Sequence, residues 1–171
     1  MNKLAIFVVA AMGICCLVVS QAQADTTDAI NVTVTLTDSI SVALTGDDVP
    51  TWDIGAIECG GTPVVSTVVT ATNDGNVAED FKIEGEDANS WTIGASADED
   101  VFVVKAAVGT PYETFSIVLE NGTTPVSLDT SVAMYSGETL FKLQYTPPSS
   151  DTVGGSESHG FAITVTASKT T

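Results

Sequence analysis

Hydrophobic and polar residues alternate with a period of two along most of this chain, which is the pattern of a β-strand that buries one of its faces. The clearest run is Ile30–Leu36, in which aliphatic residues occupy the even positions and Asn or Thr the odd ones. Similar alternation recurs around residues 40–44, 65–71, 81–83, 102–108, 115–119, 141–145 and 161–167. No segment of the sequence shows a convincing 3.6-residue period over three turns. We therefore expect an all-β fold.

The dipeptide Asn121-Gly122 stands between two such runs and is typical of a type I′ turn, in which both central residues take positive φ. A two-residue loop at this point predicts a β-hairpin with Ile117 opposite Val126. The same register places Phe115 opposite Leu128, so that the apolar faces of the two strands agree. These patterns together predict a single antiparallel, immunoglobulin-like β-sandwich of about eight strands.

Residues 1–24 contain the parts of a secretory signal peptide in the required order. Lys3 precedes an apolar run from Leu4 to Val19, and the triplet Ala22-Gln23-Ala24 fits a cleavage site between small residues. The run is shorter than the ~20 residues of a membrane-spanning helix. We expect cleavage before Asp25, with an uncleaved anchor as the alternative. The mature protein would be exported to the cell surface or extracellular space, or remain in the periplasm, without inserting into a membrane.

The charge balance excludes several classes of function. The chain has 22 Asp and Glu residues, 5 Lys and no Arg, which gives a formal net charge of −17. Nucleic acids and anionic membranes require basic residues, so neither is an expected partner. His159 lies near Ser156 and Glu157, but the loop lacks the Gly-x-Ser-x-Gly elbow of many hydrolases. We expect a protein that is not an enzyme, with His159 as a solvated loop residue.

Acidic residues in the predicted loops suggest calcium as a candidate ligand, because this ion prefers six to eight oxygen ligands. The best candidates are Asp74, Asp98 and Asp100, although the sequence contains no EF-hand pattern. The plainer alternative is that these carboxylates face only water. We expect no cofactor other than calcium.

Cys59 is the single cysteine outside the predicted signal peptide. In an oxidising compartment it could form an intermolecular disulfide, and the alternative is an inert, buried thiol at a strand edge. Trp52 and Trp91 have apolar neighbours at strand spacing, which favours core packing over an aromatic binding platform. The residues that we expect to be buried are Trp52, Phe81, Trp91, Phe115, Phe141, Leu143 and Ile163.

The even-numbered apolar residues continue to Leu44, and a single strand from Ile30 would then span ~50 Å, which is too long for an ordinary sandwich. Asp38 interrupts the apolar face, so we expect the segment to divide there. Residues 25–37, called the arm below, would form an N-terminal strand or an assembly element, and residues 38–171 the sandwich domain. As an assembly element, the arm would add to a sheet edge of another copy and bury its apolar face only there. The alternative is pairing within the same domain. The residues concerned are Ile30, Val32, Val34 and Leu36.

Three stretches of the chain carry a resemblance, namely Trp52–Gly55, Val69–Phe81 and Phe161–Ala167. They resemble parts of the small exported immunoglobulin-like domains of bacterial surface and cell-envelope proteins, in which a strand ends in a similar Asn-x-Gly-Asn turn. More distantly, the overall architecture is similar to that of subunits of bacterial and archaeal fibres and pili. The resemblance implies a fold more than a function.

These observations predict a non-enzymatic, exported structural protein of the cell surface or extracellular matrix. Its expected partners are further copies of itself, as in a fibre subunit, or other cell-surface proteins. The alternative is a soluble adhesion or binding module for carbohydrate or calcium.

Overall fold

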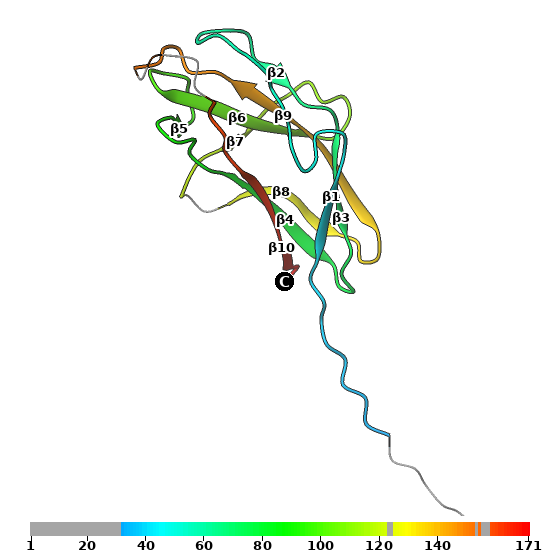
Figure 1. Cartoon of the computed structure of the whole chain (residues 1–171). Coiled ribbons are helices and arrows are strands. Elements are labelled where there is room, and N and C mark those ends of the chain that lie inside the picture. Colours follow the sequence, from blue (N-terminus) through cyan, green and yellow to red (C-terminus); the bar gives the residue numbers. More distant parts are fainter. Residues whose placement is uncertain (1–31, 123–124, 153, 155–157) are drawn as a thin grey trace, which may run out of the picture. The chain divides into compact units, whose positions relative to one another are not determined.

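The computed structural model describes residues 32–122, 125–152, 154 and 158–171 (Figure 1). The predicted signal peptide and Ile30 lie outside the described residues. The chain divides into two units, Met1–Leu36 and Thr37–Thr171, and the second is compact and contains every strand of the described part. Val32–Leu36 belong to no strand.

The prediction of an all-β fold is confirmed, because the described residues form ten strands in two sheets and no helix. None of this part of the chain therefore provides a helix long and apolar enough to cross a membrane. Two of the strands have only two residues each. The alternation predicted around residues 65–71 is divided between one of them, which ends at Val65, and the next strand, which begins at Val69. The strands are β1 (Val42–Thr45), β2 (Val64–Val65), β3 (Val69–Asn73), β4 (Glu79–Gly85), β5 (Thr92–Ile93), β6 (Val101–Val108), β7 (Ile117–Leu119), β8 (Val126–Val132), β9 (Gly137–Thr146) and β10 (Ile163–Lys169).

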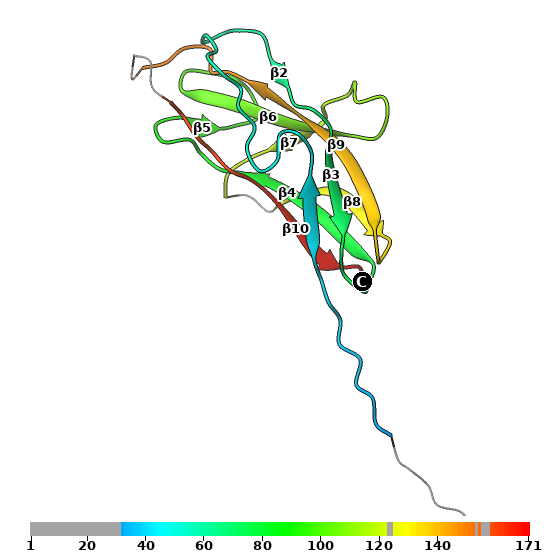
Figure 2. The ribbon, with the colours of Figure 1, turned by 45° about the vertical axis from the view of Figure 1, so that its right-hand side comes forward.

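The larger sheet has the strand order β1-β3-β9-β6-β5, with β2 also paired to β9 and β7 to β6. The smaller sheet has the order β10-β4-β8. All the pairings are antiparallel except that of β5 with β6. The two sheets form two layers, with β1 and β10 as neighbouring edge strands (Figures 1 and 2).

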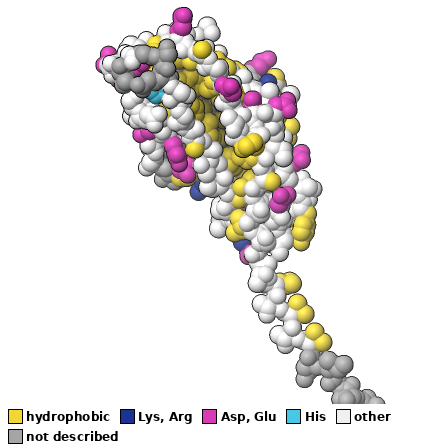
Figure 3. Space-filling model, in the orientation of Figure 1, with side chains coloured by type: hydrophobic (Ala, Val, Ile, Leu, Met, Phe, Trp, Pro, Cys, Tyr) yellow, Lys and Arg dark blue, Asp and Glu magenta, His cyan; other side chains and the backbone are white. Residues whose placement is uncertain are grey.

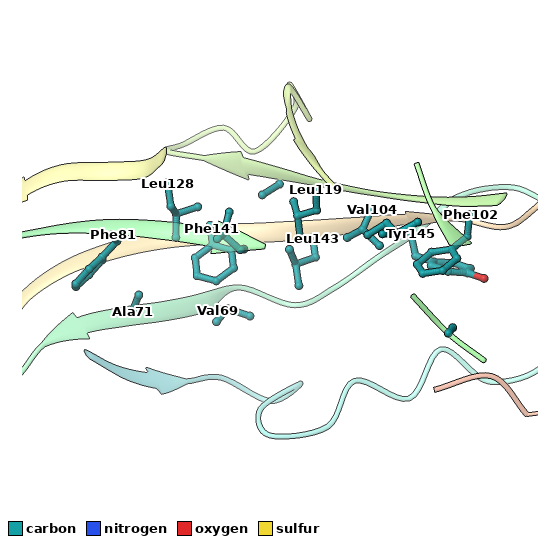
Figure 4. Packing of buried hydrophobic residues seen from close by; sticks show 14 of the residues in the cluster. Val69, Ala71, Phe81, Phe102, Val104, Leu119, Leu128, Phe141, Leu143 and Tyr145 are labelled. Carbon is teal, nitrogen blue, oxygen red and sulfur yellow. The ribbon is translucent and has the colours of Figure 1, made fainter. Parts of the chain in front are cut away.

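The core lies between the two layers and follows from the alternation in the sequence. Along β4, every second residue is fully buried, and Phe81 and Ile83 are 0 % exposed. In Figure 4, Phe81 of the smaller sheet and Phe141 and Leu143 of the larger sheet point into the same interior space. These three aromatic and aliphatic residues were predicted to be buried. The other predicted core residues, Trp52, Trp91, Phe115 and Ile163, are only partly buried.

The predicted hairpin at Asn121-Gly122 is wrong. Strand β7 pairs with β6 in the larger sheet, where Ile117 lies opposite Ala106. Strand β8 pairs with β4 in the smaller sheet, where Val126 lies opposite Ile83. The connection therefore crosses from one layer to the other. Both strands bury an apolar face in the shared core, so their alternation is the same whether they pair with each other or stand in opposite sheets.

Candidate functional site

The described residues of the arm present a row of exposed aliphatic side chains. Val32 is 77 % exposed, Val34 73 % and Leu36 91 %. The intervening Thr33 and Thr35 are also exposed, so that the segment has one apolar and one polar side if it is extended. Single exposed aliphatic residues are common on protein surfaces, but a contiguous apolar row is typical of an interaction site.

The last residue of the arm, Thr37, and the chain that follows it are held by the turn at residues 73–76, called the root turn below. Asn76 accepts a hydrogen bond from the backbone N–H of Ser39 at 2.7 Å and donates one through its side-chain amide to the carbonyl oxygen of Thr37 at 3.0 Å. The backbone N–H of Asp74 donates to the carbonyl oxygen of Ser41 at 3.0 Å. Residues 37–41 therefore have a fixed position on the compact unit.

Two buried polar residues support the root turn from the interior. The Glu79 carboxyl accepts a hydrogen bond from the backbone N–H of Ser41 at 2.8 Å, and its second oxygen, Oε2, has no partner among the described residues. The Asn73 side chain donates to two backbone carbonyl groups and accepts from the N–H of Gly75 at 2.8 Å. Both residues are 0 % exposed. The Asn-x-Gly-Asn turn is thus part of a buried polar network that fixes the root of the arm.

A groove of about 1120 Å³ with an apolar floor lies between the edge strands β1 and β10 (Figure 3). Its floor is the inner face of the larger sheet, including Phe141, Leu143 and Tyr145. One side is formed by residues 158–165, which lead into β10, and the other by the loop at residues 48–59. Figure 3 shows hydrophobic side chains gathered in a hollow on this face of the compact unit. This volume is large enough for a peptide strand or a small ligand.

One part of the groove carries an aromatic pair. The rings of Trp91 and His159 stack with their centroids 3.8 Å apart and their planes at 9°. The indole N–H of Trp91 donates to Asp151 at 3.4 Å, and Nδ1 of His159 is buried without a hydrogen-bond partner among the described residues. His159 is therefore partly buried against an indole ring, and the prediction of a solvated loop residue is wrong.

Cys59 is exposed and lines the groove, so the alternative of a buried, inert thiol at this position is wrong. Tyr145 lies on the groove floor and is 4 % exposed. Burial, and to a smaller extent the neighbouring Cys59, raise the pKa of Tyr145 to about 12. The phenol therefore stays neutral at the groove floor over the physiological pH range.

Two of the three calcium candidates, Asp98 and Asp100, lie close together in sequence before β6, and both accept hydrogen bonds. Asp98 accepts from the backbone N–H of Glu99 at 2.8 Å. Asp100 accepts from the hydroxyl and from the backbone N–H of Thr152, and these bonds lower the pKa of the Asp100 carboxyl. The Asp100 carboxylate thus joins the loop before β6 to Thr152, whereas the Asp98 carboxylate is bound within its own loop.

The third candidate, Asp74, belongs to the root turn at the opposite end of the sheet. Asn73, which precedes it, pairs with Gly137 at the start of β9, whereas Val103, near the start of β6, pairs with Thr146 at the end of β9. The structure therefore does not bring Asp74 to Asp98 and Asp100. No group of three or more His, Cys, Asp or Glu side chains suited to a metal occurs within residues 32–122, 125–152, 154 and 158–171.

Sequence reasoning recognised the Asn-x-Gly-Asn turn but missed what it holds. The available signal was the position of Glu79, which shares one strand face with Phe81 and Ile83 and so places a carboxyl in the core. A buried carboxyl needs a hydrogen-bond donor, and here the backbone of Ser41 supplies it. The groove had no sequence signal of its own, because it arises where the edges of two sheets meet.

A comparison of the chain with protein-family models, with curated proteins and with solved structures found no match. Function must therefore be inferred from the arm, the root turn and the groove.

Proposed function

We propose that this protein is a non-enzymatic, exported structural subunit of the cell surface or extracellular matrix, built on an immunoglobulin-like β-sandwich, which self-associates through its arm. The observation that supports this function is the exposed aliphatic row of Val32, Val34 and Leu36 in a segment that belongs to no strand. Such a row resembles one face of a strand that has not yet been paired.

Pairing of the arm with a sheet edge of another copy would bury this apolar face. The same pairing would supply hydrogen-bond partners to the backbone N–H and C=O groups of the arm. Full burial of an aliphatic side chain contributes ~1.5–3 kcal/mol. Three such side chains would offset much of the entropy lost when the arm becomes ordered, which costs ~1–2 kcal/mol per residue. The backbone hydrogen bonds of the new pairing would add to this gain.

The test is a double substitution on the apolar face, Val32→Asp with Val34→Asp, in purified protein comprising residues 25–171. The matched control is Thr33→Asp with Thr35→Asp, which adds the same charge to the polar face of the same segment. We expect the unchanged protein and the control to form oligomers or filaments with rising concentration, in sedimentation velocity and electron microscopy, and the apolar-face variant to remain monomeric. Because the surface is strongly acidic, association should strengthen with added salt. An unchanged protein that stays monomeric throughout would refute the proposal.

A second candidate function, a binding module for carbohydrate, is favoured by the stacked Trp91 and His159 beside Asp151 in the groove. An aromatic face next to a carboxylate suits a sugar ring with its hydroxyl groups. Titration of the monomer with a panel of oligosaccharides, followed by isothermal titration calorimetry, tests this candidate. Saturable binding that is lost in Trp91→Ala, together with the absence of self-association, would favour it over the structural role.

A further inference from the structure

We infer that the groove between β1 and β10 is the site that receives the arm of a second copy of this chain. The inference rests on the proposed function and specifies the surface that self-association uses. The claim concerns a non-covalent strand insertion, in which the apolar face of residues 30–36 enters the groove of a neighbouring subunit.

The first observation is that the groove lies beside two strand edges that pair with no further strand among the described residues. Strand β1 is terminal in the larger sheet, and β10 is terminal in the smaller sheet. The two edges are neighbours in both views of the fold (Figures 1 and 2). An exposed strand edge offers a row of backbone donors and acceptors to an incoming strand.

The second observation is that the core is incompletely covered at this place. In β4, in the middle of the smaller sheet, the inward-facing Phe81 and Ile83 are fully buried. In β10, at its edge, the inward-facing Ile163 and Val165 are only partly buried although they pack against the same core. Leu44 of β1 is likewise partly buried. A strand laid in the groove would complete the cover of these side chains.

The third observation is that the arm and β10 have matching patterns. Strand β10 has seven residues, and the apolar row of the arm also spans seven positions, Ile30–Leu36. Both alternate aliphatic residues with small polar ones, and Thr164, Thr166 and Ser168 on the outer side of β10 are exposed. An added strand with its aliphatic side chains inward would therefore extend the smaller sheet. The inner face of the sheet would remain aliphatic and the outer face polar.

Charge also fits this occupant. The groove floor is apolar, and acidic residues, among them Asp48, Asp53 and Asp151, contribute to its lining. An acidic peptide would be repelled by these carboxylates. The arm carries no charged residue between Ile30 and Thr37, so this segment brings no further carboxylate into the groove.

The connection of the arm to the compact unit favours a second copy over the chain's own groove. Thr37 and Ser39 are fixed by Asn76 of the root turn, and the chain runs from there directly into β1. For residues 30–36 to lie beside their own β1, the chain would have to reverse direction next to Thr37, where it is already bound. The arm of another copy meets no such restriction.

The first test uses two full-chain variants of residues 25–171 with complementary defects. Val32→Asp with Val34→Asp disrupts the apolar face of the arm. Ile54→Asp places a charge in the groove wall, on a loop residue that is only partly buried. Circular dichroism and thermal unfolding establish that both variants fold. We expect neither variant to assemble alone, and an equimolar mixture to form heterodimers that grow no further, because each pair has one intact arm and one intact groove.

The second test does not depend on a groove substitution. Cysteine is introduced singly at Val32, Val34 or Leu36, and oxidative cross-linking to the native, exposed Cys59 of the groove is followed by non-reducing electrophoresis. Cysteine at Thr33 or Thr35 is the matched control. In the Cys59→Ser background, any cross-link that remains must join the introduced cysteines of two arms. We expect at least one position of the apolar face to give intermolecular dimers at several times the yield of the controls, and this yield to fall to background in Cys59→Ser.

The outcomes separate the inference from the proposed function. If the arm variant fails to assemble, while Ile54→Asp assembles normally and no arm position cross-links to Cys59, the groove is not the receptor but self-association through the arm stands. Cross-links formed within one chain would show that the arm occupies its own groove and would overturn the inference. If the unchanged protein remains monomeric, both proposals fail.

Discussion

Glu79, which is 0 % exposed, accepts a hydrogen bond from the backbone N–H of Ser41 at 2.8 Å, and so a core carboxyl holds the chain just before β1. Glu79→Ala would leave this N–H without its acceptor and open a cavity in the core. We expect it to lower the free energy of unfolding by about 2–4 kcal/mol. Glu79→Gln, which keeps an acceptor oxygen, should cost less.

Urea denaturation measures both losses, and hydrogen exchange at Ser41 locates them. The control is Glu84→Ala, whose side chain is on the outer face of the same strand and is only partly buried. Equal effects of Glu79→Ala and Glu84→Ala would contradict the role assigned to the buried carboxyl.

Gly75 is the position in the root turn where a side chain has no room. A Cβ atom there would collide with the carbonyl oxygen of Ser39 and with Oε1 of Glu79. Gly75→Ala should therefore destabilise the protein by about 1–3 kcal/mol and increase exchange at the backbone of residues 37–41. Gly160→Ala is the control, because its added methyl group meets no atom within 4 Å. Normal protection of residues 37–41 in Gly75→Ala would show that the turn does not fix the root of the arm.

Phe141 is 1 % exposed and packs in the core between the two sheets. Phe141→Ala should lower the free energy of unfolding by about 3–5 kcal/mol through lost burial and the cavity that remains. Chemical denaturation followed by Trp fluorescence provides the measurement. Tyr135→Ala, at a site that is 69 % exposed, serves as the control and should shift the midpoint little. An unchanged midpoint for Phe141→Ala would contradict the assigned core.

The raised pKa of the Tyr145 phenol predicts a loss of stability at alkaline pH. Its pKa is raised to about 12 in the folded protein, chiefly by burial, whereas an unfolded tyrosine titrates near 10. The folded state thus keeps the proton longer, so this contribution is fully present below pH ~10 and is lost as the pH rises from ~10 to ~12. The loss should amount to about 3 kcal/mol. Tyr145→Phe should flatten the dependence of the unfolding free energy on pH in this window, as measured by urea denaturation at a series of pH values, and an unchanged dependence would contradict the assignment.

The start of the mature chain is a further prediction, because Ala22-Gln23-Ala24 follows the apolar run as a cleavage site requires. Protein recovered from a host that exports it should begin at Asp25, as determined by N-terminal sequencing or intact mass. Ala24→Leu should block the cleavage and leave a longer product. Recovery of the unchanged protein with Met1 still present would favour the uncleaved anchor.

The sequence alternation predicted strands where one face is buried, because burial of every second side chain is a local property. Strands β4 and β10 were found in this way, with Phe81 and Ile163 on their inner faces. The partners of β7 and β8 could not be predicted, since a strand has the same alternation in either sheet. Sheet membership depends on the packing of the whole core.

Only the part of the candidate site that depends on local sequence, the apolar row of the arm, could be predicted. The row of Val32, Val34 and Leu36 could be read from the sequence, and the structure leaves all three exposed. The hydrogen bonds that hold Ser39 join residues 37 positions apart, and such long-range contacts have no local signal. The calcium candidates were chosen because they fall in predicted loops, but the sequence does not show at which end of the sheet a loop lies, and Asp74 lies at the other end of β9 from Asp98.

The root turn and the groove are different surfaces of the same compact unit, and this difference has a consequence for symmetry. If the arm that starts at the root turn fills the groove of the next subunit, the contact is heterologous, since donor and acceptor surfaces are not the same patch. Reciprocal exchange of arms between two copies would close a two-fold dimer. Insertion in one direction gives a ring or an open, polar polymer. The polymer exposes an empty groove at one end and a free arm at the other, so its two ends would grow at different rates.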